Sequence, residues 1–215
     1  MAVVPSSTRI TNEAPWNQID TPSEMNLELD ELSNKTPLDG TETVMIKDGN
    51  SWKITTVQDI SDKSTSVYAS ISSNANQQPS DTNANIVTLN QNDVLSGITH
   101  STSSNPGVIT IQKKGVYVIV ATYQVGRTTT GGTIIISGWI KKNGTDVTDS
   151  GMSQALATTD VLKVMTLNYV IPLDIGDTIS FYQSIDTTGK GAGLLTSMAL
   201  NGPTVGSVDV IIFKI

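Results

Sequence analysis

The segment from Gly115 to Val125 carries apolar residues at both its odd and its even positions. The odd positions include Tyr117 and Tyr123, and the even positions include Val118 and Val120. Successive side chains of a strand point to opposite faces, and a half-buried antiparallel strand alternates apolar with polar residues. The segment is therefore predicted to be a strand that is covered on both faces. The pattern leaves open which parity fills the core.

Strand-like segments separated by Gly, Pro and Asn turns fill the chain from residue 66 onward. The predicted strands are 67–71, 86–89, 107–112, 115–125, 133–142, 146–154, 161–171, 178–185 and 205–215. Many short strands without a helix-length apolar pattern are typical of a β-sandwich or barrel. The segments 134–136, 161–171 and 208–215 are also apolar on both faces. Because one sandwich buries one face per strand, residues 66–215 are predicted to form an obligate homo-oligomer.

The first sixty residues have a different pattern, which predicts an arm and a small module. Residues 21–24, Thr-Pro-Ser-Glu, are typical of a helix start with a capping box, and an apolar stripe follows them. The alternating runs 42–47 and 51–55 flank an Asp-Gly pair, which predicts a β-hairpin. So small a module is expected to need partners. The predicted organisation is an extended attachment arm at 1–20, a helix and hairpin module at 21–60, a linker at 61–65 and a head domain at 66–215.

The predicted arm contains one cluster of large apolar residues, Pro15, Trp16 and Ile19. A Trp in a polar terminal arm either packs back onto its own chain or anchors the arm in another protein's pocket. The sequence favours neither alternative. These residues are candidates for attachment to a larger assembly.

Charge and cysteine content exclude several classes of protein. The 215 residues have a net charge of −7 and no cysteine, so neither a disulfide nor a cysteine–zinc site is expected. Residues 1–60 hold ten acids against four bases, and no basic stripe of the kind that binds nucleic acid is present. No window reaches the roughly 20 apolar residues that span a bilayer, and the first residues lack a secretory signal. A soluble protein without membrane insertion is predicted.

Candidate catalytic residues are few. His100 is the only histidine, so no multi-histidine metal site is expected, and the run around it lacks a nucleophile-elbow motif. A glycosidase would need two paired carboxylates, and no spacing selects a pair. The candidate carboxylates for such a pair are Asp146, Asp149, Asp160 and Asp174. We therefore predict no catalytic, metal or cofactor site and no enzymatic activity.

Several motifs of the head occur in a familiar order. They are Tyr68, Gly115-x-Tyr117, the run from Trp139 to Gly144, and Leu173-x-x-Gly176-Asp177-x-Ile179. With a closing apolar strand, residues 66–215 resemble the complement globular-head and tumour-necrosis-factor-like jelly roll. The resemblance implies an all-β, ten-stranded jelly-roll sandwich that forms a tight homotrimer. The residues expected in the trimer interface or the core are Tyr117, Val118, Val120, Tyr123, Leu167, Tyr169, Ile211 and Phe213.

Residues 38–55 are similar to repeats near the start of tailed-bacteriophage fibre and appendage proteins. This resemblance implies a virion structural protein, assembled in the host cytoplasm and bound to capsid or tail proteins through residues 1–60. The expected function is a trimeric fibre or appendage whose head contacts a host-surface glycan. Two alternatives remain, a capsid head fibre or decoration protein without a specific receptor, and a polysaccharide-degrading enzyme. A location on head, collar or tail is not predicted.

The jelly-roll strand order predicts which loops share an end of the sandwich. Loops 113–115, 143–144 and 172–177 are expected at one end, together with both termini of the domain. Loops 126–132, 157–160 and 186–206 are expected at the opposite, distal end. Loops on a rigid scaffold commonly carry function, and short hydroxyl side chains hydrogen-bond sugars. The candidate ligand contacts are Arg127, Thr128, Thr129, Thr130, Thr158, Thr159 and Lys190.

Overall fold

A computed structural model of the chain describes residues 43–48, 51–56, 66–158, 162–198 and 201–215. The chain divides into two units between residues 63 and 64, and each is described by itself. The predicted arm at 1–20, with Pro15, Trp16 and Ile19, and the predicted helix that starts at residue 21 lie outside the described residues. Among the described residues, no helix is long and apolar enough to cross a membrane.

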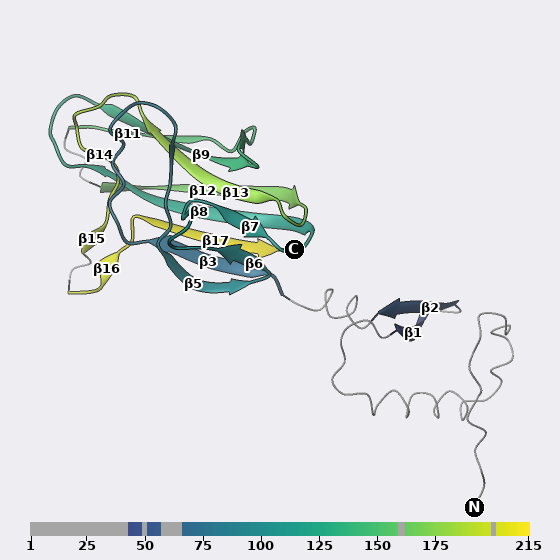
Figure 1. Cartoon of the computed structure of the whole chain (residues 1–215). Coiled ribbons are helices and arrows are strands. Elements are labelled where there is room, and N and C mark those ends of the chain that lie inside the picture. Colours follow the sequence, from purple (N-terminus) through teal and green to yellow (C-terminus); the bar gives the residue numbers. More distant parts are fainter. Residues whose placement is uncertain (1–42, 49–50, 57–65, 159–161, 199–200) are drawn as a thin grey trace, which may run out of the picture. The chain divides into compact units, whose positions relative to one another are not determined.

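The described part of the first unit is an antiparallel hairpin of β1 (Thr43–Asp48) and β2 (Ser51–Thr56) (Figure 1). The register pairs Asp48 with Ser51 and Met45 with Ile54. The predicted hairpin is therefore confirmed. Met45 and Ile54 are both exposed, so the hairpin has apolar side chains that its own strands do not bury.

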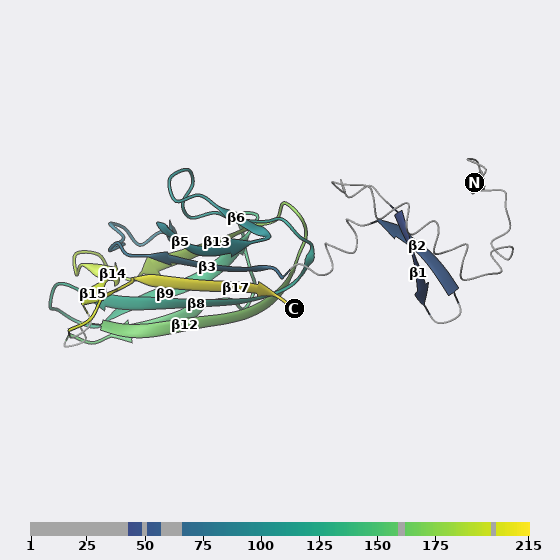
Figure 2. The ribbon, with the colours of Figure 1, turned by 90° about the horizontal axis from the view of Figure 1, so that it is seen from below.

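The second unit is a sandwich of two antiparallel sheets, which we name after their central strands. The β8 sheet contains β12 (Leu162–Leu173), β8 (Gly115–Arg127), β17 (Val208–Lys214), β3 (Tyr68–Ser73) and β5 (Gln91–Ser96) in that order, with β14 (Ala192–Leu194) also paired to β8. The β13 sheet contains β10 (Thr145–Asp146), β9 (Ile134–Lys142), β13 (Thr178–Ile185), β7 (Ile109–Ile111) and β6 (Ile98–His100), with β11 (Met152–Leu156) paired to β9 and β4 (Asn85–Ile86) paired to β13. A separate small ladder joins β15 (Ser197–Met198) and β16 (Thr204–Val205). Figure 2 shows β12, β8, β17 and β3 side by side in the first sheet.

The strand order is that of a jelly roll. In chain order the principal strands are β3, β7, β8, β9, β11, β12, β13 and β17. Numbered one to eight, they lie in one sheet as 1-8-3-6 and in the other as 2-7-4-5, which is the arrangement that two Greek keys produce. The predicted all-β jelly-roll sandwich is confirmed. Its sheets hold six and seven strands rather than ten in all, because short segments also pair along the principal strands.

The prediction of one strand over residues 146–154 is wrong. Asp149 has a φ of 61°, a left-handed conformation that ends the strand and turns the chain. The hydroxyl of Ser150, which is buried, donates a hydrogen bond of 2.8 Å to the Val147 carbonyl and accepts one of 3.1 Å from the Ile140 amide. These bonds hold the turn between β10 and β11.

The core lies between the two sheets, and β8 supplies its centre. The odd residues of β8 point inward, and those from Tyr117 to Val125 are 0% exposed. The even residues, including Val118 and Val120, lie on the outer face. Leu167 of β12 is buried in the core, whereas Tyr169 is half-buried and its hydroxyl donates a 2.7 Å hydrogen bond to the Thr148 carbonyl. The odd residues of β8 therefore fill the core, a choice that the sequence pattern left open.

One polar network joins two of the loops predicted to share the proximal end. The carboxylate of Asp177 accepts hydrogen bonds from the Asn143 amide group at 2.7 Å and the Asp174 backbone amide at 2.8 Å. The Lys142 ammonium lies 2.7 Å from the same carboxylate. These contacts, the bond to Lys142 first among them, lower the pKa of Asp177 to about 2. The motif containing Asp177 therefore fastens the 172–177 loop to the β9 turn.

Two buried tyrosines of β8 make a matched test of the core. The Tyr117 hydroxyl donates a hydrogen bond to the Lys113 carbonyl, whereas the Tyr123 hydroxyl is buried without a partner among the described residues. Tyr123→Phe should raise the free energy of unfolding by about 1 kcal/mol, and Tyr117→Phe should lower it by about as much. Urea unfolding at one fixed protein concentration measures both values. Equal losses in the two variants would contradict this assignment.

The Asp177 network makes the stability of the head depend on pH. Its native pKa lies below the ordinary value of 3.8, so its stabilisation is complete above about pH 4 and is lost as the pH falls toward 2. Asp177→Asn should lower stability at pH 7 and flatten the stability profile between pH 4 and 2. Asp174→Asn, in the same loop, should keep the acid-dependent loss that Asp177 causes. Thermal unfolding across this pH range provides the comparison.

Candidate functional site

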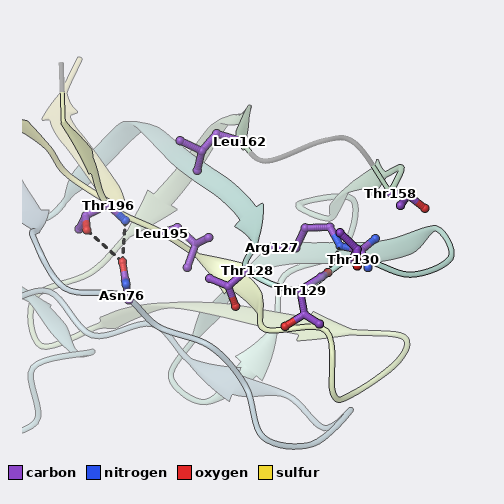
Figure 3. Close-up of a pocket in the computed structure, with 9 residues that line it drawn as sticks. All are labelled: Asn76, Arg127, Thr128, Thr129, Thr130, Thr158, Leu162, Leu195 and Thr196. Carbon is purple, nitrogen blue, oxygen red and sulfur yellow. Dashed lines mark hydrogen bonds between the residues drawn. The ribbon is translucent and has the colours of Figure 1, made fainter. Parts of the chain in front are cut away.

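A pocket of about 420 Å³ lies where β8 ends and β12 begins (Figure 3). Its lining consists of Asn76, Arg127, Thr128, Thr129, Thr130, Thr158, Leu162, Leu195 and Thr196. The structure thus brings together five of the seven residues predicted as distal ligand contacts. Lys190 lies beside the same loop, as described below, and Thr159 lies outside the described residues.

Backbone pairing positions the two principal loops of the pocket. β8 continues two residues beyond its predicted end at Val125, and β14 pairs Ala192 with Arg127. The pairing continues as the amides of Thr128 and Thr129 donate 3.1 Å hydrogen bonds to the carbonyls of Gly191 and Lys190. Gly191 has a φ of +57°, and a Cβ there would lie 1.9 Å from the Thr128 hydroxyl oxygen. Only glycine allows the two segments to approach this closely.

Arg127 organises the loop that follows β8. Its side chain is buried, with 4% exposure. Nε donates a 2.8 Å hydrogen bond to the Thr129 carbonyl, and Nη1 donates one of 2.7 Å to the Gly132 carbonyl. Nη2 is also buried and makes no hydrogen bond with any described residue. The guanidinium therefore uses two of its three nitrogens to close the loop and has a third without a partner.

A second cation lies at the edge of the same loop. A Cβ placed on Gly131 would be only 2.5 Å from the Lys190 ammonium nitrogen, so this ammonium lies directly against the Gly131 backbone. The Thr158 hydroxyl donates a 2.6 Å hydrogen bond to the Gly131 carbonyl from the other side. Segments far apart in the sequence therefore meet around residues 127–132.

Four lining residues were not predicted individually. Asn76 comes from the connection after β3. Its side-chain oxygen Oδ1 accepts hydrogen bonds from the Thr196 backbone amide at 2.8 Å and from the Thr196 hydroxyl at 3.0 Å (Figure 3). The strand order could have predicted the position of Asn76. The chain enters β3 at the proximal end of the sandwich, so the residues that follow β3 lie at the distal end, beside the pocket. Leu162 and Leu195 are apolar, so nothing in the sequence marked them as ligand contacts, and they give the pocket an apolar side.

The outer face of the β8 sheet carries an apolar row that crosses four strands. In the register, Val118 of β8 lies between Val170 of β12 and Phe213 of β17, and Phe213 lies beside Tyr68 of β3. Val170, Phe213 and Tyr68 are 57%, 39% and 42% exposed. Ile211 and Val120 face each other in the next row. Large apolar side chains that lie together on a surface mark a contact site.

The same face is poor in charge. Among the outward-facing positions of β12, β8, β17 and β3, only Asp209 carries a charge. It lies opposite Thr122, one row further from the apolar residues than Ile211. Burial raises the pKa of Asp209, and the nearby carboxylate of Asp93 raises it further. An assembly that used this face would bury mainly apolar side chains.

The outer face of the β13 sheet differs, because its two largest described side chains, Trp139 and Tyr182, contact each other. The rings of Trp139 and Tyr182 stack with centroids 5.9 Å apart, and Lys141 lies 4.7 Å above the Tyr182 ring. Asp146 accepts a 2.7 Å hydrogen bond from the indole and lies 3.3 Å from the Lys141 ammonium. Among the described residues, the β8 sheet therefore carries more exposed apolar side chains than the β13 sheet, where Ile135 and Ile86 are exposed.

The described side chains that line the pocket can form hydrogen bonds with a ligand. The pocket lining has hydroxyl, amide and guanidinium groups, and no carboxylate or histidine is part of it within the described residues. The ring nitrogens of His100 are engaged elsewhere, with the Asn92 side-chain oxygen at 2.6 Å and the Pro106 carbonyl at 3.0 Å. Asp146 and Asp174 pair with lysines, and Asp160 lies outside the described residues. No group of His, Cys, Asp or Glu in the described ranges could hold a metal ion.

No protein-family model matches the sequence, and a search of curated proteins found no match. Solved structures of similar fold include murine APRIL at pH 5.0, with 12% identity and a TM-score of 0.46. They also include murine APRIL at pH 8.5, with 13% identity and a TM-score of 0.43. Each match covers 70% of this chain and 99% of the APRIL chain. The jelly-roll assignment itself rests on the strand order and registers given above.

Proposed function

We propose that the chain is a virion structural protein, the subunit of a homotrimeric phage fibre or appendage. Residues 1–60 attach it to capsid or tail proteins, and the jelly-roll head contacts a host-surface glycan through its distal pocket. The observation that carries the proposal is the exposed apolar row formed by Val170, Val118, Phe213 and Tyr68. A lone subunit would present this row to water.

A second copy of the chain is the occupant that best suits the apolar face. Among the outward-facing positions of β12, β8, β17 and β3, only Asp209 is charged, so the apolar row does not require a partner of opposite charge. Full burial of a side chain such as Val118 or Phe213 stabilises an assembly by about 1.5–3 kcal/mol. Closed cyclic symmetry covers such a face on every subunit. The number three comes from the resemblance of residues 66–215 to trimeric jelly-roll heads.

Attachment through the N-terminal region is supported by the resemblance of residues 38–55 to phage fibre repeats and by the hairpin. Met45 and Ile54 lie opposite each other and remain exposed. A two-stranded hairpin is not stable alone and needs a surface to pack against. A capsid or tail protein would provide that surface.

A structural role without a receptor is the second candidate. It is favoured by the intramolecular hydrogen bonds of the pocket, since the Thr158 hydroxyl and the Asn76 side chain already bond to the protein itself. In that case the chain is a capsid head fibre or decoration protein, and the pocket has no ligand.

The assembly is tested by placing a charge on the apolar face. The full chain at micromolar concentration should have the mass of a trimer in analytical ultracentrifugation. Val118→Asp and Ile211→Asp should give monomers, because a buried unpaired carboxylate costs several kcal/mol. Ile135→Asp is the matched control, since Ile135 is 43% exposed on the β13 sheet and Ile211 is 42% exposed on the β8 sheet. A monomeric wild-type chain, or trimers of both face variants, would refute the proposed assembly.

Host contact is tested with labelled full chain and cells of the bacterium that the particle infects. The trimer should bind these cells, and periodate oxidation of the cell-surface sugars should abolish the binding. Protease treatment of the cells should leave it unchanged. A trimer that does not bind the cells would support the receptor-free decoration protein instead.

A further inference from the structure

We infer that the distal pocket recognises an anionic sugar, one that carries a carboxylate or a phosphate group. The inference rests on the proposed function and specifies the class of glycan that the head contacts. It is carried by the buried guanidinium of Arg127, which lines the pocket.

The charge of Arg127 has no counter-ion among the described residues. Nε and Nη1 donate to carbonyl oxygens, which are neutral acceptors, and Nη2 makes no bond. Burying a charge costs free energy unless the charge is paired with an opposite one. If Arg127 only held the loop together, nothing would offset the cost of burying its charge. An anion in the adjoining pocket would compensate the charge. Arginine is also the side chain whose planar donors best match carboxylate and phosphate oxygens.

Lys190 adds to the positive potential at the same place. Its ammonium lies against Gly131, in the loop that Arg127 closes, and no described acid forms an ion pair with it. None of the described residues that line the pocket is a carboxylate. Charges of one sign in a concave surface with low-dielectric walls focus the field and attract the opposite charge. Lys190 does not line the pocket, so its charge acts from the loop beside it.

The remaining lining suits a sugar. The volume of about 420 Å³ lies within the range of roughly 300–1,000 Å³ that is usual for small-molecule sites. Thr129 and Thr130 supply hydroxyl groups, and Leu162 and Leu195 supply an apolar side for the C–H face of a sugar ring. The anion would bind beside the guanidinium. A direct bond to Nη2 requires a small movement of the groups that cover it, because this atom is buried.

The inference is tested with matched probes that differ in charge. Oligogalacturonate carries carboxylates, and its methyl ester has the same backbone without the charge. A poly(glycerol phosphate) oligomer supplies the phosphate alternative. Calorimetric titration of each probe into the full-length wild-type chain should show that a charged probe binds at least 10-fold more tightly than the methyl ester. Which charged probe binds more tightly identifies carboxylate or phosphate as the ligand group.

Charge variants locate the binding in the pocket. Arg127→Gln should weaken binding of the charged probe 10- to 100-fold, and Lys190→Gln should weaken it 2- to 5-fold. Arg127→Lys keeps the charge but not the loop bonds, and it should stay within about 5-fold of wild type. Lys114→Gln is the control, because Lys114 precedes β8 at its opposite end, about 40 Å from Arg127 along the strand. Lys190 makes no bond in the loop interior, so Lys190→Gln remains informative if Arg127→Gln fails to fold.

Three results of the titrations would overturn the inference. They are equal affinity for the charged and esterified probes, no binding of any probe at millimolar concentration, and unchanged affinity in both Arg127→Gln and Lys190→Gln. Binding of the trimer to host cells that survives both substitutions would also overturn it, while leaving the proposed function intact. A wild-type chain that is monomeric and does not bind cells would instead be a failure of the proposed function.

Discussion

The packing of this head depends on β8, which carries apolar residues on both of its faces. Its inward residues from Tyr117 to Val125 are fully buried, and its outward valines Val116, Val118 and Val120 are left partly exposed by the described chain. The antiparallel registers align Val118 with apolar residues of three other strands of the sheet. The apolar residues on the outer face of β8 therefore form part of a continuous apolar surface. In the proposed assembly, a second copy of the chain covers this surface.

The sequence predicted the sandwich because apolar β-branched segments and Gly or Asn turns recur at strand spacing. It did not predict which face of β8 is inside, since both parities are apolar. The facing strand decides this, because Gly138 of β9 lies 2.7 Å from the Tyr123 ring when given a Cβ. The tyrosines of β8 point inward where the opposite sheet leaves room for a ring. Such complementarity between distant strands is not visible in either segment alone.

The strands that the sequence missed are short or polar; β14, for example, has only three residues, although all three are buried. β5, Gln91–Ser96, is polar and largely exposed, so it has no apolar alternation to detect. For the pocket, strand order predicted the convergence of three loops and hence of Arg127 and Thr158. Asn76 and Thr196 join it through side-chain hydrogen bonds, which depend on loop conformation rather than on residue type. Topology is therefore recoverable from sequence patterns, whereas loop-to-loop contacts are not.

The apolar row and the pocket lie at different ends of the same strands, which has a consequence for binding strength. Val118 and Phe213 are near the proximal end, where β17 finishes, and Arg127 is at the distal end of β8. In the proposed trimer, cyclic symmetry about an axis along the strands places all copies of the pocket at one end. In each pocket the Thr158 hydroxyl and the Asn76 side chain already bond to the protein itself, so a single sugar would bind weakly. Simultaneous contact with a polymer raises the overall affinity by roughly 10²–10⁴ without any new contact. The assembly face is thus what would make a weak pocket useful on a surface of repeating sugars.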